Sequence, residues 1–315
     1  MKDQILSVSL IVLLDHAEER ISSLYENIVR HLEATEKSFE LIFVDDGSRD
    51  KTYALLQEIS QKDARVRVIR MRARFGEAAA FDAGLKNSRG EKVLFITERV
   101  RVNVSQLSNL LSALNESYDF VVGRRYPRRD SVLNRWVSRW FNGLVNRISK
   151  LDLQDINSGV FAAKRSVFES LPTYGDLFNF LPVLAAQQGY KLTEVDIEQM
   201  PGTFRTSRYF SEYIRRLLDI VTVFFLTRYS KKPIHFMGFL GMIFFFSGLI
   251  IELYLFVYRI FQFGPIAGRP LLILGALLLI IGIQMVSIGL LGEMIIFTHA
   301  GEIEEYNIEE IINNE

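Results

Sequence analysis

The sequence predicts an α/β domain with a mostly parallel sheet, followed by two helices that cross a membrane. Short runs of Val, Ile and Leu alternate with segments of helical spacing, as in β-strands joined by crossover helices. The first run is almost continuously apolar, which is typical of a strand covered on both faces. Charged side chains become rare after Lys232. In such sheets the crossovers are right-handed, and ligands bind at the carboxyl ends of the strands.

Pairs of a strand and a helix are expected up to Leu114. The strands are predicted at Ile5 to Leu14, Leu41 to Val44, Val66 to Met71 and Lys92 to Thr97. The helices that follow them are predicted at Ala17 to Leu32, Thr52 to Ile59, Glu77 to Lys86 and Val104 to Leu114. Ser48 stands where a side chain would cap the second helix, and a fifth strand is expected at Phe120 to Gly123.

A basic segment with interleaved aromatic residues runs from Arg124 to Arg147. Two interpretations of it stay open. It forms a solvated amphipathic helix, or it forms a surface that contacts anionic lipid headgroups or a phosphorylated ligand. The second interpretation rests on the affinity of Arg for phosphate and of aromatic rings for the membrane interface.

Two apolar runs near the C-terminus are long enough to cross a bilayer. Pro233 to Tyr258 contains one ionised side chain, Glu252, and Leu271 to Ala300 contains one, Glu293. A span needs about 20 apolar residues. A pair of buried soluble helices is the alternative, but two runs of this length are hard to bury inside a small core.

The flanks of these runs predict the orientation of an integral membrane protein. Basic residues precede the first run at Arg215, Arg216, Arg228, Lys231 and Lys232. The loop between the runs offers only Arg259 and Arg269. Because positive charge favours the cytoplasmic side, the N-terminal domain is expected in the cytosol, at the plasma (inner) membrane if the chain is bacterial.

We therefore expect four regions. These are a cytosolic domain at 1–208, an interfacial juxtamembrane helix at 209–232, a transmembrane hairpin at 233–300 and an acidic cytosolic tail at 301–315. The spans and the tail are candidate surfaces for a homo-oligomer. The absence of cysteine excludes disulfides and thiolate chemistry, and the zero net charge argues against a generic nucleic-acid binder.

The most specific motif runs from Val44 to Thr52, directly after a strand. The carboxylates of Asp45 and Asp46 at the strand end can accept hydrogen bonds from a ribose or a base. Gly47 lets the chain turn sharply beside a ligand. An ordinary Asp-Gly turn is the alternative interpretation of this motif.

Other motifs accompany it at Gly76 to Gly84, Gly123 to Arg125, Asp155 to Phe161 and Ser207 to Tyr209. With them the chain resembles the family 2 glycosyltransferases, inverting enzymes of the A-type glycosyltransferase fold. Among these it is similar to the polyisoprenyl-phosphate (dolichol-phosphate) hexose synthases. The resemblance implies transfer of a hexose from a nucleotide diphosphate sugar to a polyisoprenyl phosphate at the cytosolic membrane face, in cell envelope glycosylation.

The resemblance also implies roles for particular residues. The nucleotide-sugar site would consist of Asp45, Asp46, Gly47, Gly76 and Arg125. Asp155 would be the catalytic residue near the acceptor, as a candidate base or as a group that orients the acceptor.

The sequence departs from the family where a metal ion is expected. Relatives carry Asp-x-Asp for Mg²⁺ or Mn²⁺ at the strand end that here continues as Glu98, Arg99 and Val100. Glu98 can supply one metal ligand and Val100 none. Arg74, Arg99 and Arg101 are candidates to clamp the diphosphate without a metal.

Two functions stay open. The first is an active hexosyltransferase, with a metal or with an arginine clamp. The second is a catalytically inactive glycosyltransferase-like membrane subunit that acts as a scaffold or as the partner of an active paralogue. A transporter is disfavoured, because two spans without a polar stripe make a poor pathway.

Overall fold

The computed structural model describes residues 6–35, 38–98, 100–128, 132–149, 151–171, 175–200, 232–266 and 270–298, with residues 218, 221, 225 and 229. The chain forms two compact units, Met1–Val223 and Phe224–Glu315. Most of the expected juxtamembrane helix, the Ser207 to Tyr209 motif and all of the acidic tail lie outside the described residues.

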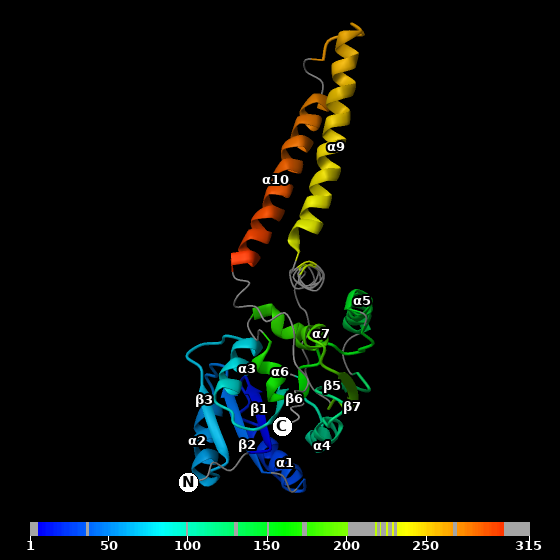
Figure 1. The fold of residues 1–315 in the computed structure, drawn as a ribbon. Coiled ribbons are helices and arrows are strands. Elements are labelled where there is room, and N and C mark those ends of the chain that lie inside the picture. Colours follow the sequence, from blue (N-terminus) through cyan, green and yellow to red (C-terminus); the bar gives the residue numbers. More distant parts are fainter. Residues whose placement is uncertain are drawn as a thin grey trace. The chain divides into compact units, whose positions relative to one another are not determined.

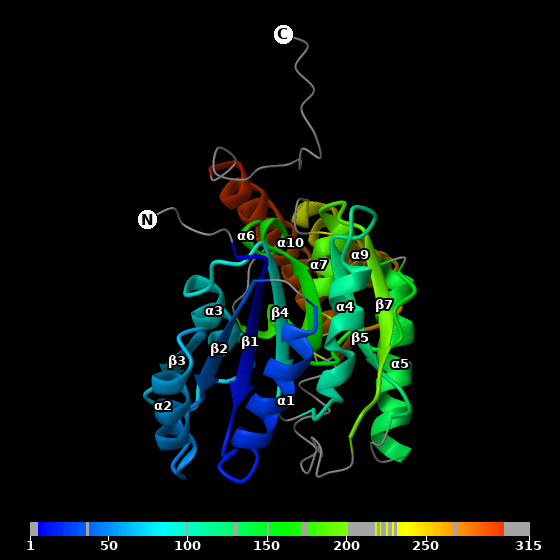
Figure 2. The same ribbon diagram turned by 90° about the horizontal axis from the view of Figure 1, so that it is seen from below.

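The first unit is built on a seven-stranded sheet in the order β3-β2-β1-β4-β6-β5-β7 (Figure 2). The strands are β1 Val8–Leu14, β2 Phe39–Asp45, β3 Val66–Arg70, β4 Lys92–Thr97, β5 Phe120–Arg125, β6 Val160–Lys164 and β7 Leu192–Ile197. β6 runs antiparallel to β4 and β5, and the other neighbouring strands are parallel. The predicted mostly parallel sheet is confirmed.

Helices cover both faces of this sheet (Figure 1). On one face lie α1 Ile21–Glu33, α2 Thr52–Lys62, η1 Val104–Gln106 and α4 Leu107–Ala113. On the other lie α3 Glu77–Lys86, α5 Val132–Ser149, α6 Arg165–Glu169, η2 Gly175–Phe180 and α7 Leu181–Gln187. Successive side chains of a strand point to opposite faces. Leu10 and Val12 of β1 accordingly join the first core, and Ile11 and Leu13 join the second.

The expected capping role of Ser48 is wrong. Helix α2 begins at Thr52, and the Thr52 N–H donates to Oδ1 of Asp50 at 3.1 Å. The Ser48 hydroxyl instead accepts from the backbone N–H of His16 at 3.0 Å. Ser48 therefore ties the loop after β2 to the loop after β1, and Asp50 takes the position near the helix start.

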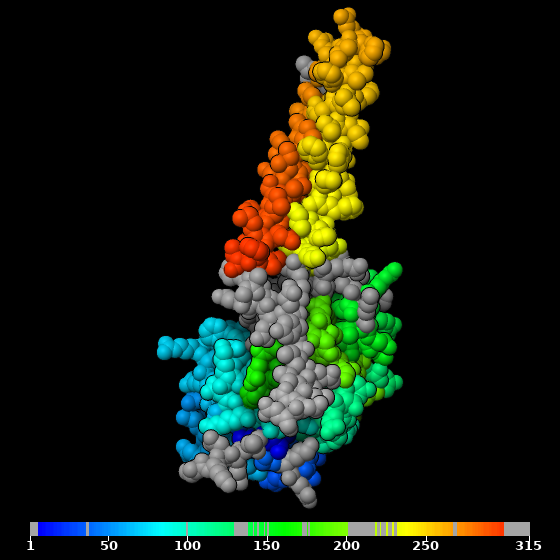
Figure 3. Space-filling model, in the orientation of Figure 1, coloured from blue at the N-terminus to red at the C-terminus, as the bar shows by residue number. Residues whose placement is uncertain are grey.

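The second unit contains a helical hairpin of α9 Pro233–Ile260 and α10 Pro270–Thr298 (Figures 1 and 3). Both helices are long and apolar enough to cross a membrane. Glycines recur every seventh residue along α10, at Gly275, Gly282 and Gly289. A Cβ at Gly282 would lie 2.6 Å from the backbone nitrogen of Phe245. Small residues therefore bring the two backbones close together, as in many membrane helix pairs.

Candidate functional site

The candidate site lies along the carboxyl edge of the sheet. β2 ends there at Asp45, β4 at Thr97 and β5 at Arg125. β1 separates β2 from β4, and β6 separates β4 from β5. Neighbouring strands are about 4.8 Å apart, so each of these ends lies about 10 Å from the next. The edge presents polar groups at these three positions.

At the end of β2, the two neighbouring aspartates make different hydrogen bonds. Oδ1 of Asp45 accepts from the backbone N–H of Ser48 at 3.1 Å, while its buried Oδ2 has no hydrogen-bond partner among the described residues. Asp46 accepts from the N–H groups of Phe75 at 2.7 Å and Gly76 at 3.0 Å. Asp46 therefore fixes the loop before α3, and Asp45 keeps an unused acceptor.

The two predicted glycines shape the same loops. Gly47 has a φ of 73°, and a Cβ there would lie 2.7 Å from the carbonyl carbon of Ala73. A side chain at position 47 would push away the loop that Asp46 holds. Gly76 has a φ of 91° and directly precedes α3. Both positions need the left-handed backbone that glycine adopts without strain.

A basic cavity of about 830 Å³ opens beside Asp46 and Gly47. Its arginines are Arg49, Arg70, Arg72 and Arg74. Asp15 lies among them, with its Oδ2 3.1 Å from Nη2 of Arg74 and its Oδ1 2.8 Å from Nδ1 of His16. Arg74 therefore belongs to the cavity at the end of β2.

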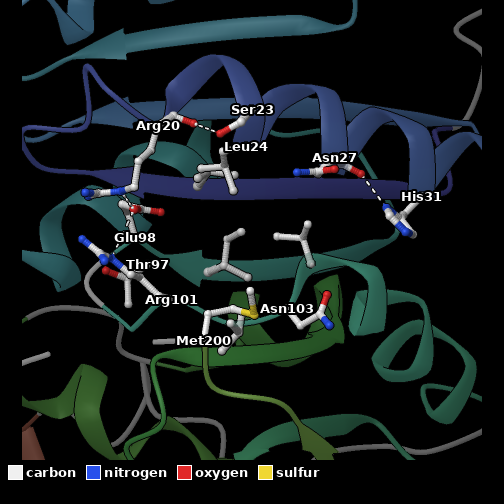
Figure 4. Close-up of a pocket in the computed structure, with 14 residues that line it drawn as sticks. Arg20, Ser23, Leu24, Asn27, His31, Thr97, Glu98, Arg101, Asn103 and Met200 are labelled. Atoms are coloured by element: carbon white, nitrogen blue, oxygen red, sulfur yellow. Dashed lines mark hydrogen bonds and ion pairs between the residues drawn. The ribbon is translucent and has the colours of Figure 1, made fainter. Parts of the chain in front are cut away.

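At the end of β4, Glu98 is engaged by arginine. Its Oε1 accepts from Nε of Arg20, and Nε of Arg101 lies 3.8 Å from the same oxygen. These residues line a groove of about 300 Å³ between α1 and the segment after β4 (Figure 4). The structure brings Arg101 to Glu98 but places Arg74 in a different cavity. Arg99 lies outside the described residues.

The groups at the end of β4 do not fit the Mg²⁺ or Mn²⁺ ion that the sequence resemblance implies. Glu98 is already paired with Arg20. Val100 is 3% exposed and belongs to the apolar core, so its position does not face a ligand. Among the described residues no group of three His, Asp or Glu side chains is placed to hold a metal. Divalent ions of this kind need several oxygen ligands.

At the end of β5, Arg125 and Asp155 form a buried ion pair. Nε and Nη2 of Arg125 donate to the two carboxylate oxygens at 2.6 and 2.8 Å. Burial acts to raise the pKa of Asp155, but the charge and hydrogen bonds of Arg125, and then the charge of Arg128, hold that pKa below its usual value. An ionised carboxylate held in this way is a weak proton acceptor. The pair suits an orienting role for Asp155, and its catalytic role stays a prediction.

Glu194 of β7 holds the backbone beside this ion pair. Its Oε1 accepts from the backbone N–H groups of Gln154 at 2.7 Å and Asp155 at 2.9 Å. Burial raises the pKa of Glu194, and the nearby Asp155 charge adds to that shift. Glu194 was not predicted as a site residue, because no strand was predicted around it.

A second basic cavity, of about 520 Å³, adjoins the ion pair. Its cationic residues are Arg124, Arg125, Arg128 and Arg139. Arg139 comes from α5, and Asn142 of the same helix lines the wall. Arg124 is also paired with Asp196 of β7 at 2.7 Å. Four arginines of the basic segment thus line one cavity, which favours the phosphorylated-ligand interpretation of that segment.

Comparison with known proteins decides the family. Residues 11–171, just over half of the chain, match the family described as glycosyl transferase family 2. The chain belongs to glycosyl transferase family 2. This membership agrees with the sheet order and with the placement of the polar groups at one edge.

Two relatives match this glycosyltransferase along most of its length. The dodecaprenyl-phosphate galacturonate synthase of Rhizobium johnstonii is 28% identical, over 94% of this chain and 89% of its own. The undecaprenyl-phosphate 4-deoxy-4-formamido-L-arabinose transferase of Photorhabdus laumondii is also 28% identical, over 93% of this chain and 90% of its own.

A solved structure has the same fold. The glucosyl-3-phosphoglycerate synthase of Mycobacterium tuberculosis, solved with Mg²⁺ and uridine diphosphate, matches with a TM-score of 0.52. The match covers 70% of this chain and 79% of that one, at 18% identity. That protein binds a divalent metal, whereas the donor set at Glu98 does not match one.

Proposed function

We propose that this glycosyltransferase moves a sugar of the hexose class from a nucleotide diphosphate sugar to a polyisoprenyl phosphate at the cytosolic face of a membrane. The observation that carries the proposal is the basic cavity at Arg125 and Asp155, on the same sheet edge as Asp45. Similarity along most of the chain to two relatives named for polyprenyl-phosphate acceptors supports it. The apolar hairpin fits a lipid acceptor, which stays in the membrane plane.

The three positions along the edge suggest a division of roles. The buried Oδ2 of Asp45 is available to accept a hydrogen bond from a nucleoside. Arg139, which is exposed and lines the cavity, is suited to an acceptor phosphate, because guanidinium groups pair with phosphate oxygens through two parallel hydrogen bonds. Arg125, held by Asp155, adds positive charge to the cavity wall. The nucleoside and the acceptor would then lie on either side of the end of β4. The sugar and the diphosphate, which lie between them, would be bound at that strand end.

The chemistry follows from this arrangement. An oxygen of the acceptor phosphate forms a bond with the anomeric carbon, and the bond from that carbon to the diphosphate breaks with inversion. The nucleoside diphosphate leaves with the bonding electron pair. The acceptor phosphate is already anionic near neutral pH, so positioning contributes more to the rate than a strong base. Asp155 holds Arg125 in place for this step.

The alternative function is a catalytically inactive membrane subunit that acts as a scaffold or as a partner of an active paralogue. The lack of a metal-binding pair of carboxylates at the end of β4 is the observation that favours it. A homo-oligomer, through the hairpin or the tail, stays a prediction in either case.

The acceptor assignment is tested by transfer kinetics with undecaprenyl phosphate as the varied substrate. We expect Arg139→Gln to raise KM for this lipid about tenfold or more and to leave KM for the sugar donor nearly unchanged. Arg147→Gln is the matched control, since Arg147 is exposed on the same helix. Equal KM values for the lipid in both variants would contradict the assignment.

A further inference from the structure

Two guanidinium groups flank one carboxylate at the end of β4 (Figure 4). Arg20 directly precedes α1, Glu98 directly follows β4, and Arg101 comes three residues after Glu98. The side chain of Glu98 is 10% exposed, that of Arg101 25% and that of Arg20 37%. The carboxylate is therefore covered, while both guanidinium groups reach the groove.

As far as the described residues show, this cluster keeps positive charge and unused hydrogen-bond donors. Two cations and one anion leave a net charge of about +1 on the cluster. The contacts of Arg20 and Arg101 with Glu98 involve their Nε atoms. Within the described part of the chain, the Nη groups of both arginines donate no side-chain hydrogen bond. Such groups present several N–H donors in a plane that matches phosphate oxygens.

The backbone holds Arg101 in an uncommon conformation. Its φ is 48°, in the left-handed region that residues with a Cβ seldom adopt. Its carbonyl accepts from the N–H of Met200 at 2.9 Å, and Val102 forms a β-bridge with Gln199. Backbone strain of this kind persists where the surrounding structure fixes it, and it often accompanies function.

The cluster also lies at the position that the reaction assigns to the diphosphate. The diphosphate joins the nucleoside to the sugar, so it must lie between the groups that hold the nucleoside and the acceptor. The end of β4 is about 10 Å from the ends of both β2 and β5, by the strand spacing. The groups placed there by the fold are Glu98 and its two arginines.

We propose that Arg20 and Arg101 bind the diphosphate of the sugar donor directly, and that Glu98 positions these arginines instead of binding a metal ion. This inference rests on the proposed function and names the groups that stabilise its leaving group. Positive charge placed at a leaving diphosphate stabilises the charge that develops there. Glu98 is a positioning residue, because it acts through the arginines.

The first test is binding of uridine and guanosine diphosphate to the full chain in detergent, by calorimetry, with EDTA or with Mn²⁺. We expect at least one of them to bind in EDTA with a Kd within about threefold of that in Mn²⁺. Arg20→Gln should weaken this metal-free binding about tenfold to a hundredfold, as expected for lost hydrogen bonds to a charged ligand. Arg30→Gln, on the exposed face of α1, should not change it.

The second test separates a positioning carboxylate from a metal ligand. In Glu98→Gln the amide oxygen still accepts from Arg20, while a charge that repels the diphosphate is removed. We expect metal-free binding that is unchanged or tighter, whereas a metal ligand would lose the Mn²⁺ effect on binding. Arg20→Gln/Glu98→Gln leaves no unpaired carboxylate, so it tests the loss of Arg20 even if the single variant unfolds. Thermal unfolding monitors the fold of each variant.

The outcomes distinguish this inference from the proposed function. Binding that requires Mn²⁺ and is lost in Glu98→Gln would overturn the inference and leave the transferase proposal intact. Binding by the double variant as tight as in the unmodified chain would also overturn it. If neither nucleotide binds with or without metal, both the inference and the proposed function fail.

Discussion

Arg125 and Asp155 join the end of β5 to the loop after α5 through two hydrogen bonds of 2.6 and 2.8 Å. The backbone N–H of Arg125 also points at this carboxylate, 3.3 Å from Oδ2. Both side chains are almost fully buried. The contact therefore fixes the wall of the basic cavity and, at the same time, contributes to the stability of the domain.

Breaking this pair from one side should be strongly destabilising. Asp155→Ala leaves the Arg125 guanidinium buried without its counter-ion, so we expect the free energy of unfolding to fall by about 3–5 kcal/mol. Arg125→Met/Asp155→Leu removes both charges and should cost less than the single variant. Denaturant unfolding of the full chain in detergent measures both. A single variant as stable as the double one would contradict this account.

The pair of Asp63 and Arg65 predicts a dependence of stability on pH. Hydrogen bonds from Arg65, with burial opposing them, lower the pKa of Asp63 to about 2. A lowered pKa in the folded state gives stability that is present above the unfolded-state pKa of about 3.9 and is lost as pH falls toward 2. The contribution at pH 7 is at most about 2 kcal/mol.

Asp63→Asn tests this linkage. The variant should be less stable than the unmodified chain at pH 7, and the difference should shrink as pH falls from 4 toward 2. Unfolding measured across that range provides the check. A difference that stays constant with pH would mean that the carboxylate charge is not the source of the stability.

The glycines of the hairpin predict a position-specific effect. A Cβ at Gly282 would lie 2.6 Å from a backbone nitrogen and 2.7 Å from the carbonyl oxygen of Gly241. Gly282→Ala should therefore separate the helices and cost about 1–3 kcal/mol. At Gly238 the nearest atom is a side-chain carbon of Ile234 at 3.3 Å, so Gly238→Ala is the matched control. Equal thermal stability of the two variants in detergent would argue against close backbone packing.

The proposed orientation can be tested with single cysteines, because the chain contains none of its own. Ser117 lies in an exposed loop of the first unit, and Phe263 is exposed in the loop between α9 and α10. An impermeant maleimide should label Ser117→Cys only in inverted vesicles and Phe263→Cys only in intact cells or right-side-out vesicles. The reverse pattern would place the domain outside the cytosol.

The sequence predicted the first half of the fold closely. The bounds of α3 and β4 agree with those expected at Glu77 to Lys86 and Lys92 to Thr97, because their apolar patterns are continuous. β6 and β7 were missed. Most side chains of β7 are only half-buried, with Ile197 the one that is fully buried, so no apolar run marks it. The short β6 shares its first two residues with the Asp155 to Phe161 motif, and no strand was predicted there.

Site residues that belong to one motif could be predicted from the sequence. Contacts between segments distant in the sequence could not. Asp45 and Asp46 follow from a single motif at a strand end. The contact of Arg20 with Glu98 joins residues that are 78 positions apart, and the support of Asp155 by Glu194 joins the loop after α5 to the middle of β7. No local pattern reports such pairs. They depend on the order of the strands, which the sequence did not give in full.

The most direct test of the central proposal is sugar transfer by the full chain in vesicles that contain undecaprenyl phosphate. A panel of uridine and guanosine diphosphate sugars would be supplied, and the extracted lipid would be examined by mass spectrometry. We expect a lipid product heavier by one sugar residue, absent from vesicles without undecaprenyl phosphate. Failure to form a lipid product from any donor of the panel would contradict the account and favour the inactive membrane subunit.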